Sequence, residues 1–152
     1  METVQDNPVP MTIYWAGPLF SLADRSFNLD MKHRLGLSGF EVWLPQEHEP
    51  RDGTAQAIFE VNCRAIDHCD VMIANMDGAD VDSGTAWEVG YAYGRRPRMP
   101  IILFRTDFRN VPEGSGFAPF NLMLSCSAIR LLTPSMTGHQ LIDRIRIALS
   151  EF

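Results

Sequence analysis

Short apolar stretches that alternate with segments of helical periodicity constrain the fold of this chain more than any other feature. Turn-forming or polar residues bound most of these stretches, which we predict as strands at 12–16, 40–44, 71–74, 100–104 and 128–132. We predict helices at about 21–37, 54–68, 84–94 and 135–149, and a further short segment at about 121–124. Short apolar strands separated by helices are typical of a parallel sheet that helices cover on both faces.

Ligands of such sheets collect at the carboxyl ends of the strands. At that edge the sequence places Gly17, the stretch after Ala74 and the loop after Phe104. The length of 152 residues favours one domain with a sizeable core, and we find neither a repeat nor a linker. We therefore expect a single domain over residues 11–152, preceded by a flexible arm at 1–10.

The composition argues against several classes of function. A formal net charge of −6 and a pI near 5.1 do not suit binding to a nucleic-acid backbone, which needs a concentrated basic surface. We interpret the basic cluster at 95–98 as a solvated turn. The longest apolar stretch, at 99–104, is far too short to cross a bilayer, so we expect no membrane partner.

The cysteines and histidines do not suggest a metal site. Three cysteines without C-x-x-C spacing suit neither a disulfide framework nor zinc, and the four histidines form no pair at i, i+4. The first ten residues lack the basic-then-apolar order of a signal peptide. Together these features favour a cytoplasmic protein.

The predicted helix at 84–94 carries one charged residue, Glu88, among aromatic, small and apolar residues. We expect this helix to be buried almost all round, so its carboxylate needs a partner or a chemical purpose. A structural alternative exists, because Thr85 and Glu88 fit the capping box, in which the glutamate only closes the helix start. Upstream, Asp80 and Asp82 could face the same cleft. Asp82 is equally suited to be a plain N-cap.

Asn62 and Tyr14 are two further candidates for the site. Asn62 falls in the apolar stripe of the helix predicted at 54–68, where a polar amide needs hydrogen-bond partners. It either contacts a ligand or ties a loop to the core. Tyr14 lies near the carboxyl end of the first strand, and it is either a core residue with a bonded hydroxyl or a site residue.

Taken together, these segments resemble the nucleoside 2-deoxyribosyltransferase family. The matching stretches are Ile-Tyr-Trp-Ala-Gly-Pro at 13–18, Cys-Asp-Val-Met-Ile-Ala at 69–74, Asp-Ser-Gly-Thr-Ala-Trp-Glu-Val-Gly-Tyr-Ala at 82–92 and Pro-Phe-Asn-Leu-Met-Leu at 119–124. The D-x-G-x-x-x-E-x-G-x-A pattern is specific in combination with the later F-N-L-M. The resemblance implies an α/β, flavodoxin-like (Rossmann-like) three-layer sandwich with a central five-stranded parallel sheet.

The resemblance also implies an activity, the transfer of a 2-deoxyribosyl group between nucleobases with retention. Glu88 matches the family nucleophile, while Asp82 and Tyr14 match residues that hold the sugar and orient that nucleophile. Asn121, with Met123 beside it, matches a residue donated to the neighbouring subunit's site, which implies a homo-oligomer. The implied partners are 2′-deoxynucleosides and free nucleobases. This chemistry requires no metal and no redox cofactor.

Gly17, Asn62 and Gly84 complete the expected substrate-binding residues. Several family members carry aspartate where this chain has Asn62, and an asparagine can hydrogen-bond a base but cannot protonate it. The Glu-His-Glu stretch at 47–49 falls where the family contacts the base, with a solvated polar loop as the alternative.

Two other functions stay open. A sister group hydrolyses deoxynucleoside or cytidine 5′-monophosphates, but it places serine where this chain has Asp82. A phosphate charge ~4 Å from that carboxylate would cost about 4 kcal/mol at an effective dielectric of about 20, which favours the transferase. The other function is a sensor that binds a nucleoside or nucleotide without turnover. The chain has neither a G-x-G-x-x-G motif nor a P-loop for dinucleotides or triphosphates.

Overall fold

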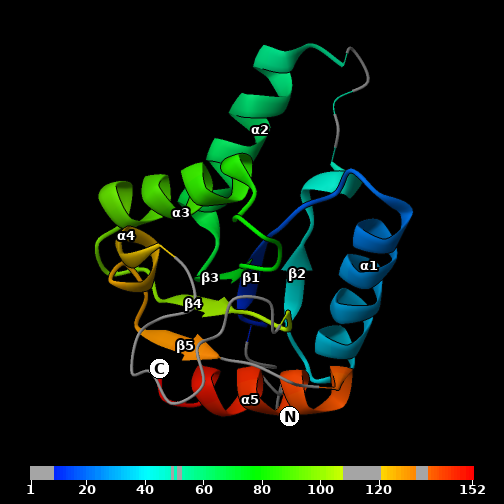
Figure 1. Ribbon diagram of the computed structural model, residues 1–152, viewed down its shortest axis with the longest axis vertical. Helices are drawn as coiled ribbons and strands as arrows, with labels where there is room; N and C mark the ends of the chain where they lie inside the picture. Colours follow the sequence, from blue (N-terminus) through cyan, green and yellow to red (C-terminus); the bar gives the residue numbers. More distant parts are fainter. Residues whose placement is uncertain (1–8, 49, 51–52, 108–120, 133–136) are drawn as a thin grey trace, which may run out of the picture.

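The computed structural model describes residues 9–48, 50, 53–107, 121–132 and 137–152. Its strands form one five-stranded parallel sheet in the order β2-β1-β3-β4-β5 (Figure 1). The strands are β1 (Thr12–Ala16), β2 (Glu41–Trp43), β3 (Val71–Asn75), β4 (Ile101–Phe104) and β5 (Arg130–Leu132). This is the flavodoxin-like strand order, so the predicted fold class is confirmed.

Helices cover both faces of the sheet, as predicted. They are α1 (Leu22–Leu37), α2 (Ala55–His68), α3 (Ser83–Arg95), α4 (Leu122–Ser125) and α5 (Gly138–Leu149), with a 3₁₀ turn η1 (Pro45–Glu47) after β2. Helices α1 and α5 pack on one face, while α2 and α3 pack on the other, with α4 against α3 (Figure 1). Three layers result, with the sheet in the middle.

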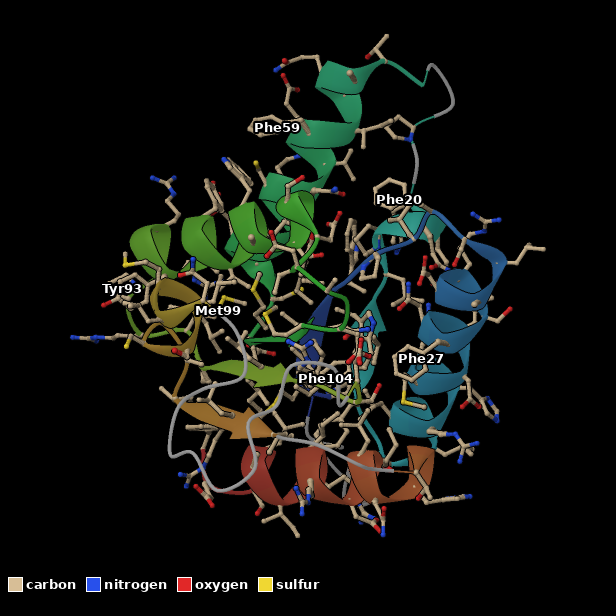
Figure 2. All side chains as sticks on the ribbon, in the orientation of Figure 1. Phe20, Phe27, Phe59, Tyr93, Met99 and Phe104 are labelled. Carbon is tan, nitrogen blue, oxygen red and sulfur yellow. The ribbon has the colours of Figure 1, made fainter. Side chains whose placement is uncertain are left out.

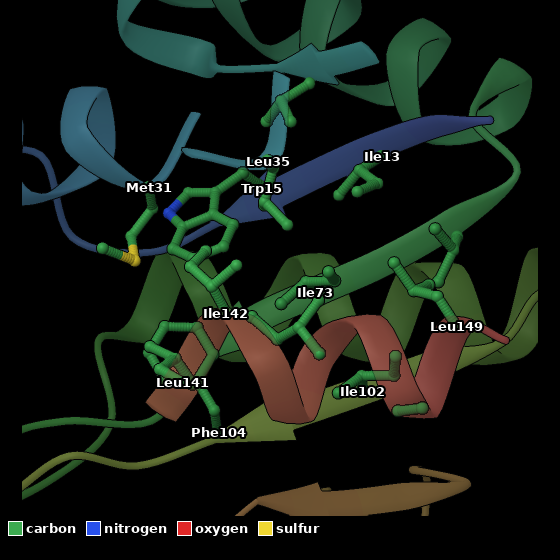
Figure 3. Close-up of a cluster of buried hydrophobic side chains, with 14 of the residues drawn as sticks. Ile13, Trp15, Met31, Leu35, Ile73, Ile102, Phe104, Leu141, Ile142 and Leu149 are labelled. Atoms are coloured by element: carbon green, nitrogen blue, oxygen red, sulfur yellow. The ribbon is translucent and has the colours of Figure 1, made fainter. Parts of the chain in front are cut away.

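The alternation of side chains along β1 divides its residues between the two cores. Ile13 and Trp15 point toward α1 and α5 and join a cluster that contains Phe104 (Figure 3). Tyr14 and Ala16 point the other way, toward α2 and α3. The period of two along this strand therefore brings Tyr14 to the face that α3 covers.

Side-chain caps set the helix starts. Ser21 and Asp24 form a capping box at α1, and Thr137 and Gln140 form one at α5. The basic cluster at 95–98 is more than the solvated turn that the sequence suggested. The guanidinium of Arg96 donates hydrogen bonds to three carbonyl oxygens at and beyond the end of α2, which are left without partners when a helix ends.

The helix and strand bounds agree with the sequence-based ranges to within a few residues, and β3 extends one residue further, to Asn75. Most of the predicted N-terminal arm, residues 1–8, and the first part of the last predicted helix lie outside the described residues. Within the part of the chain that the structure describes, no helix is both long and apolar enough to span a membrane.

Candidate active site

Tyr14 and Glu88 meet between β1 and α3. The Tyr14 hydroxyl donates a hydrogen bond of 2.7 Å to Oε1 of Glu88, and the Tyr14 side chain is fully buried. Tyr14 is therefore a core residue with a bonded hydroxyl, and its hydrogen-bond partner is the candidate nucleophile. A carboxylate oxygen fixed in this way keeps the second oxygen of the group in a defined orientation.

The environment of Glu88 raises the pKa of its carboxyl to about 7. Burial is the main cause, the charge of Asp82 adds to it, and the hydrogen bond from Tyr14 acts in the opposite direction. Burial and the neighbouring Glu88 also raise the pKa of Tyr14 far above its usual range. Tyr14 is therefore a permanent hydrogen-bond donor, and Glu88 changes its charge near neutral pH.

Asp82 is the N-cap of α3. Its Oδ2 accepts hydrogen bonds from the backbone N–H of Thr85 (2.8 Å) and from the Thr85 hydroxyl (2.9 Å). The alternative capping box between Thr85 and Glu88 is wrong, because the helix begins three residues earlier than that box requires. Glu88 is consequently one turn inside the helix and free of any capping role.

A hollow of about 310 Å³ opens beside Glu88. Its lining residues are Phe59, Asn62, Gly84, Trp87 and Glu88. Among the described residues none hydrogen-bonds the amide of Asn62, so the structure does not support a role in tying a loop to the core. A Cβ on Gly84 would lie only 3.2 Å from Asp82 Oδ2, and the glycine thus leaves room at the helix start.

Gly17 lies at the end of β1 but is not a lining residue of the Glu88 hollow. A Cβ at this position would come within 3.3 Å of the Asn75 Cβ. Gly17 therefore allows the chains that leave β1 and β3 to approach closely at the carboxyl edge of the sheet.

A second hollow, of about 440 Å³, lies at the same edge of the sheet. Asn28, Asn75 and several apolar residues line it. Four aspartates line it as well, and these are Asp24, Asp77, Asp80 and Asp82. Hydrogen bonds from Thr106 and from the backbone N–H of Asp107 hold Asp77. Among the described residues no group of side chains has the arrangement of a metal site. The electrostatic character of this edge is acidic.

Helix α3 is not buried all round, contrary to the prediction. Trp87 is 46% exposed and Tyr93 is 58% exposed. The ring of Trp87 packs against Phe59 at 5.1 Å and stacks on Tyr91 at 5.2 Å, and Phe59 projects from α2 above α3 (Figure 2). The sheet covers only one side of α3, so these aromatic residues face outward.

Asn121 and Met123 do not line the Glu88 hollow of their own chain. Asn121 caps α4 by accepting a hydrogen bond from the Met123 N–H (2.8 Å), and Met123 is 74% exposed. Both residues line another hollow, of about 640 Å³, with Val89 and Tyr93 of α3. The structure thus brings together Glu88, Asp82, Tyr14, Asn62 and Gly84, and it leaves Asn121 and Met123 apart.

The structure describes the first two residues of the stretch at 47–49. Glu47 forms an ion pair with Lys32, as expected of a solvated polar loop. His48 stacks on Trp43, with ring centroids 4.5 Å apart and an angle of 6° between the planes. Glu49 lies outside the described residues.

Sequence reasoning missed three aromatic residues of the site. Phe59 and Trp87 line the Glu88 hollow, and Trp43 stacks on Tyr14 with ring centroids 5.3 Å apart. Phe59 lies close to Asn62 on α2, and Trp87 is next to Glu88 on α3. This closeness in sequence was a possible signal that both aromatic residues belong to the site. Trp43 could be identified only from the pairing of β2 with β1, which is not evident from the sequence.

The chain matches a known family of proteins. The model of the family described as nucleoside 2-deoxyribosyltransferase matches residues 13–125. No curated protein matches the chain.

Solved structures share the fold. A conserved protein from Enterococcus faecalis V583 has a TM-score of 0.74 and 23% identity, over 92% of this chain and 99% of that one. A 2-deoxyribosyltransferase from Leishmania mexicana has a TM-score of 0.68 and 23% identity, over 90% and 98%. The CMP N-glycosidase BcmB from Clostridium botulinum has a TM-score of 0.61 and 18% identity, over 89% and 98%.

The family match spans most of the chain and contains the residues that meet in the site, from Tyr14 in β1 to Glu88 in α3. The chain therefore belongs to the nucleoside 2-deoxyribosyltransferase family.

Proposed function

We propose that this chain cleaves the N-glycosidic bond of 2′-deoxynucleosides and transfers the 2-deoxyribosyl group to another nucleobase. The observation that carries the proposal is the hydrogen bond from Tyr14 to Glu88, at the wall of a hollow that holds no other carboxylate among its described lining residues. A carboxylate oriented in this way has the geometry of a nucleophile rather than of a helix cap.

The reaction proceeds in two displacements. As the bond between C1′ and the base nitrogen breaks, the base leaves with the bonding electron pair and a proton from solvent, and Glu88 forms an ester bond to C1′. The incoming base then attacks C1′ through a ring nitrogen and loses a proton, and the Glu88 carboxylate leaves. Two inversions at C1′ restore the original configuration.

Asp82 would hold the sugar. Its Oδ2 caps α3, and no described residue donates a hydrogen bond to its Oδ1. That oxygen is therefore available to a hydroxyl group of the deoxyribose. Its negative charge also favours the positive oxocarbenium character that develops at C1′ as the base leaves.

The hollow beside Glu88 suits a nucleobase. Phe59 and Trp87 offer aromatic surface on which a planar base can stack, and the amide of Asn62, which no described residue hydrogen-bonds, offers both a donor and an acceptor. Because an asparagine cannot supply a proton, we propose that the leaving base takes its proton from water.

Asn121 and Met123 would act in a neighbouring subunit of a homo-oligomer. Their position on α4, apart from the Glu88 hollow of the same chain, supports this proposal, and so does the exposure of Met123 and Leu122. Exposed apolar side chains beside a polar residue are common at subunit interfaces.

Hydrolysis of nucleoside 5′-monophosphates is the second candidate, because the fold is also that of a CMP N-glycosidase. The charges near Glu88 count against it. Among the described residues, no lysine or arginine lines the Glu88 hollow, and the hollow that Asp82 lines carries four aspartates. A phosphate group would therefore meet repulsion without a described cationic partner.

A chromatographic assay distinguishes these functions. The chain is incubated with 2′-deoxyinosine or thymidine as donor, with and without adenine or cytosine as acceptor. We expect a new deoxynucleoside that forms only when an acceptor is present. Release of free base at the same rate in both reactions would identify a hydrolase, and 5′-monophosphates would be compared next. Nucleoside binding without turnover would instead identify a sensor.

A further inference from the structure

We propose that Trp43 is a positioning residue that holds the Tyr14 ring so that its hydroxyl reaches Glu88. The inference rests on the proposed function, because it assigns Trp43 a part in preparing the nucleophile. Trp43 does not line the Glu88 hollow, and it would therefore act only through Tyr14.

The register of the sheet places Trp43 beside Tyr14. The two residues are paired partners on the parallel strands β2 and β1, so their side chains emerge on the same face. Their rings stack with centroids 5.3 Å apart and planes 16° from parallel. This contact extends along a flat face of the Tyr14 ring, and it restricts rotation of the whole side chain.

The position of Trp43 is itself fixed. It is the last residue of β2, and its ring stacks on His48, which directly follows the 3₁₀ turn η1. The ring centroids of this second pair are 4.5 Å apart and the planes 6° from parallel. Two stacking contacts thus join the rings of His48, Trp43 and Tyr14, and the Tyr14 ring carries the hydroxyl that binds Glu88.

The geometry of a hydrogen bond makes this support important. The Tyr14 oxygen lies 2.7 Å from Glu88 Oε1, and a hydrogen bond weakens steeply with misalignment. A small rotation of the Tyr14 ring displaces its terminal oxygen more than any other atom of the side chain. Loss of the stack would therefore weaken the bond to Glu88 while β1 keeps its place in the sheet.

A double-mutant cycle tests whether Trp43 acts through Tyr14. Trp43→Leu keeps an apolar side chain on β2 but removes the stacking ring. We expect this change to lower kcat by about fivefold in the otherwise unchanged chain, with KM nearly constant. In a Tyr14→Phe background, where no hydroxyl remains to be positioned, the same change should alter kcat by less than about twofold.

Two controls separate positioning from general stability. Trp43→Phe restores a stacking ring and should return kcat to near that of the parent chain. Val42→Ala removes packing on the opposite, buried face of the same strand. It should lower Tm and leave kcat close to that of the parent chain. An equal loss of kcat for Trp43→Leu in both backgrounds, or no loss in either, overturns the inference.

A readout without turnover distinguishes failure of the inference from failure of the proposed function. If the parent chain acts on no nucleoside, the proposed function fails, and the ¹³C carboxyl signal of Glu88 is titrated instead, assigned by its loss in Glu88→Gln. We expect Trp43→Leu to move the Glu88 titration midpoint in the parent background but not in Tyr14→Phe. Equal shifts in both backgrounds, or no shift, would overturn the positioning role.

Discussion

The hydroxyl of Tyr14 lies 2.7 Å from Oε1 of Glu88, and this contact joins two residues that are 74 positions apart in the sequence. It depends on three features of the fold. The alternation along β1 turns Tyr14 toward α3, Asp82 starts α3 early enough to place Glu88 inside the helix, and α3 packs against both β3 and β1.

The activity should depend on pH through the ionisation of Glu88. A nucleophilic carboxylate must be ionised, and the pKa of Glu88 is raised to about 7. We expect kcat/KM to rise with pH and to level off above about pH 7, because this parameter reports the free enzyme. The measurement is a pH–rate profile with a donor whose base does not titrate in this range.

Two variants should move this acid limb in opposite directions. The hydrogen bond from Tyr14 lowers the pKa of Glu88, so Tyr14→Phe should shift the limb to higher pH. The charge of Asp82 raises that pKa, so Asp82→Asn should shift the residual limb to lower pH. Shifts in the same direction would mean that another group controls the profile.

The two roles of Asp82 can be separated by comparing two substitutions. Asp82→Asn keeps an oxygen that can accept from Thr85 N–H, whereas Asp82→Ala removes the cap and should cost about 1 kcal/mol of unfolding free energy. Both variants lose the charge near the sugar, so both should show a lower kcat and a higher KM. Full activity in Asp82→Asn would reduce Asp82 to a helix cap.

Burial of Glu88 should appear as a pH-dependent cost in stability. A carboxyl whose pKa rises from 4.5 to about 7 on folding favours the folded state fully below pH 4.5, and this contribution is lost as the pH rises through about 7. Relative to Glu88→Gln, the parent chain should lose up to ~3 kcal/mol of unfolding free energy across this window. Urea unfolding at several pH values measures the difference, with Glu60→Gln on the exposed face of α2 as the matched control. A constant difference between parent and Glu88→Gln would contradict the raised pKa.

Sharing of the site between subunits predicts complementation. Glu88→Ala and Asn121→Ala should each be inactive alone. If Asn121 acts in the neighbouring subunit, mixed oligomers contain sites in which both residues are intact. Partial activity should then return after the two variants are dissociated and reassembled together. Hetero-oligomers that form without any activity would exclude sharing.

Local patterns in the sequence were sufficient to predict the strands and helices, because each of these elements depends on nearby residues. The apolar runs marked the strands, the helices predicted from residues 21 and 54 begin there with Ser21 and Thr54 as N-caps, and the strand order agrees with the fold that the resemblance implies. Glu88 could be identified as unusual, since it is the one charged residue in its helical stretch. The capping-box pattern that begins at Thr85 competed with this interpretation until the position of Asp82 as N-cap excluded it.

Contacts between distant segments could not be predicted in the same way. Trp43 meets Tyr14 through the register of two strands, and Phe59 meets Trp87 through the packing of α2 on α3. The exposure of one side of α3 was also missed, because an apolar helix has the same composition whether a sheet or another surface covers it. Such relationships depend on tertiary structure rather than on residue spacing.

The most direct test of the central claim is mass spectrometry of the chain after rapid acid quench with a 2′-deoxynucleoside and no acceptor. The account predicts a deoxyribosyl adduct on the peptide that contains Glu88, which disappears when an acceptor base is added and is absent from Glu88→Gln. Turnover without an adduct at any time, or an adduct on a different residue, would contradict the role of Glu88 as the nucleophile.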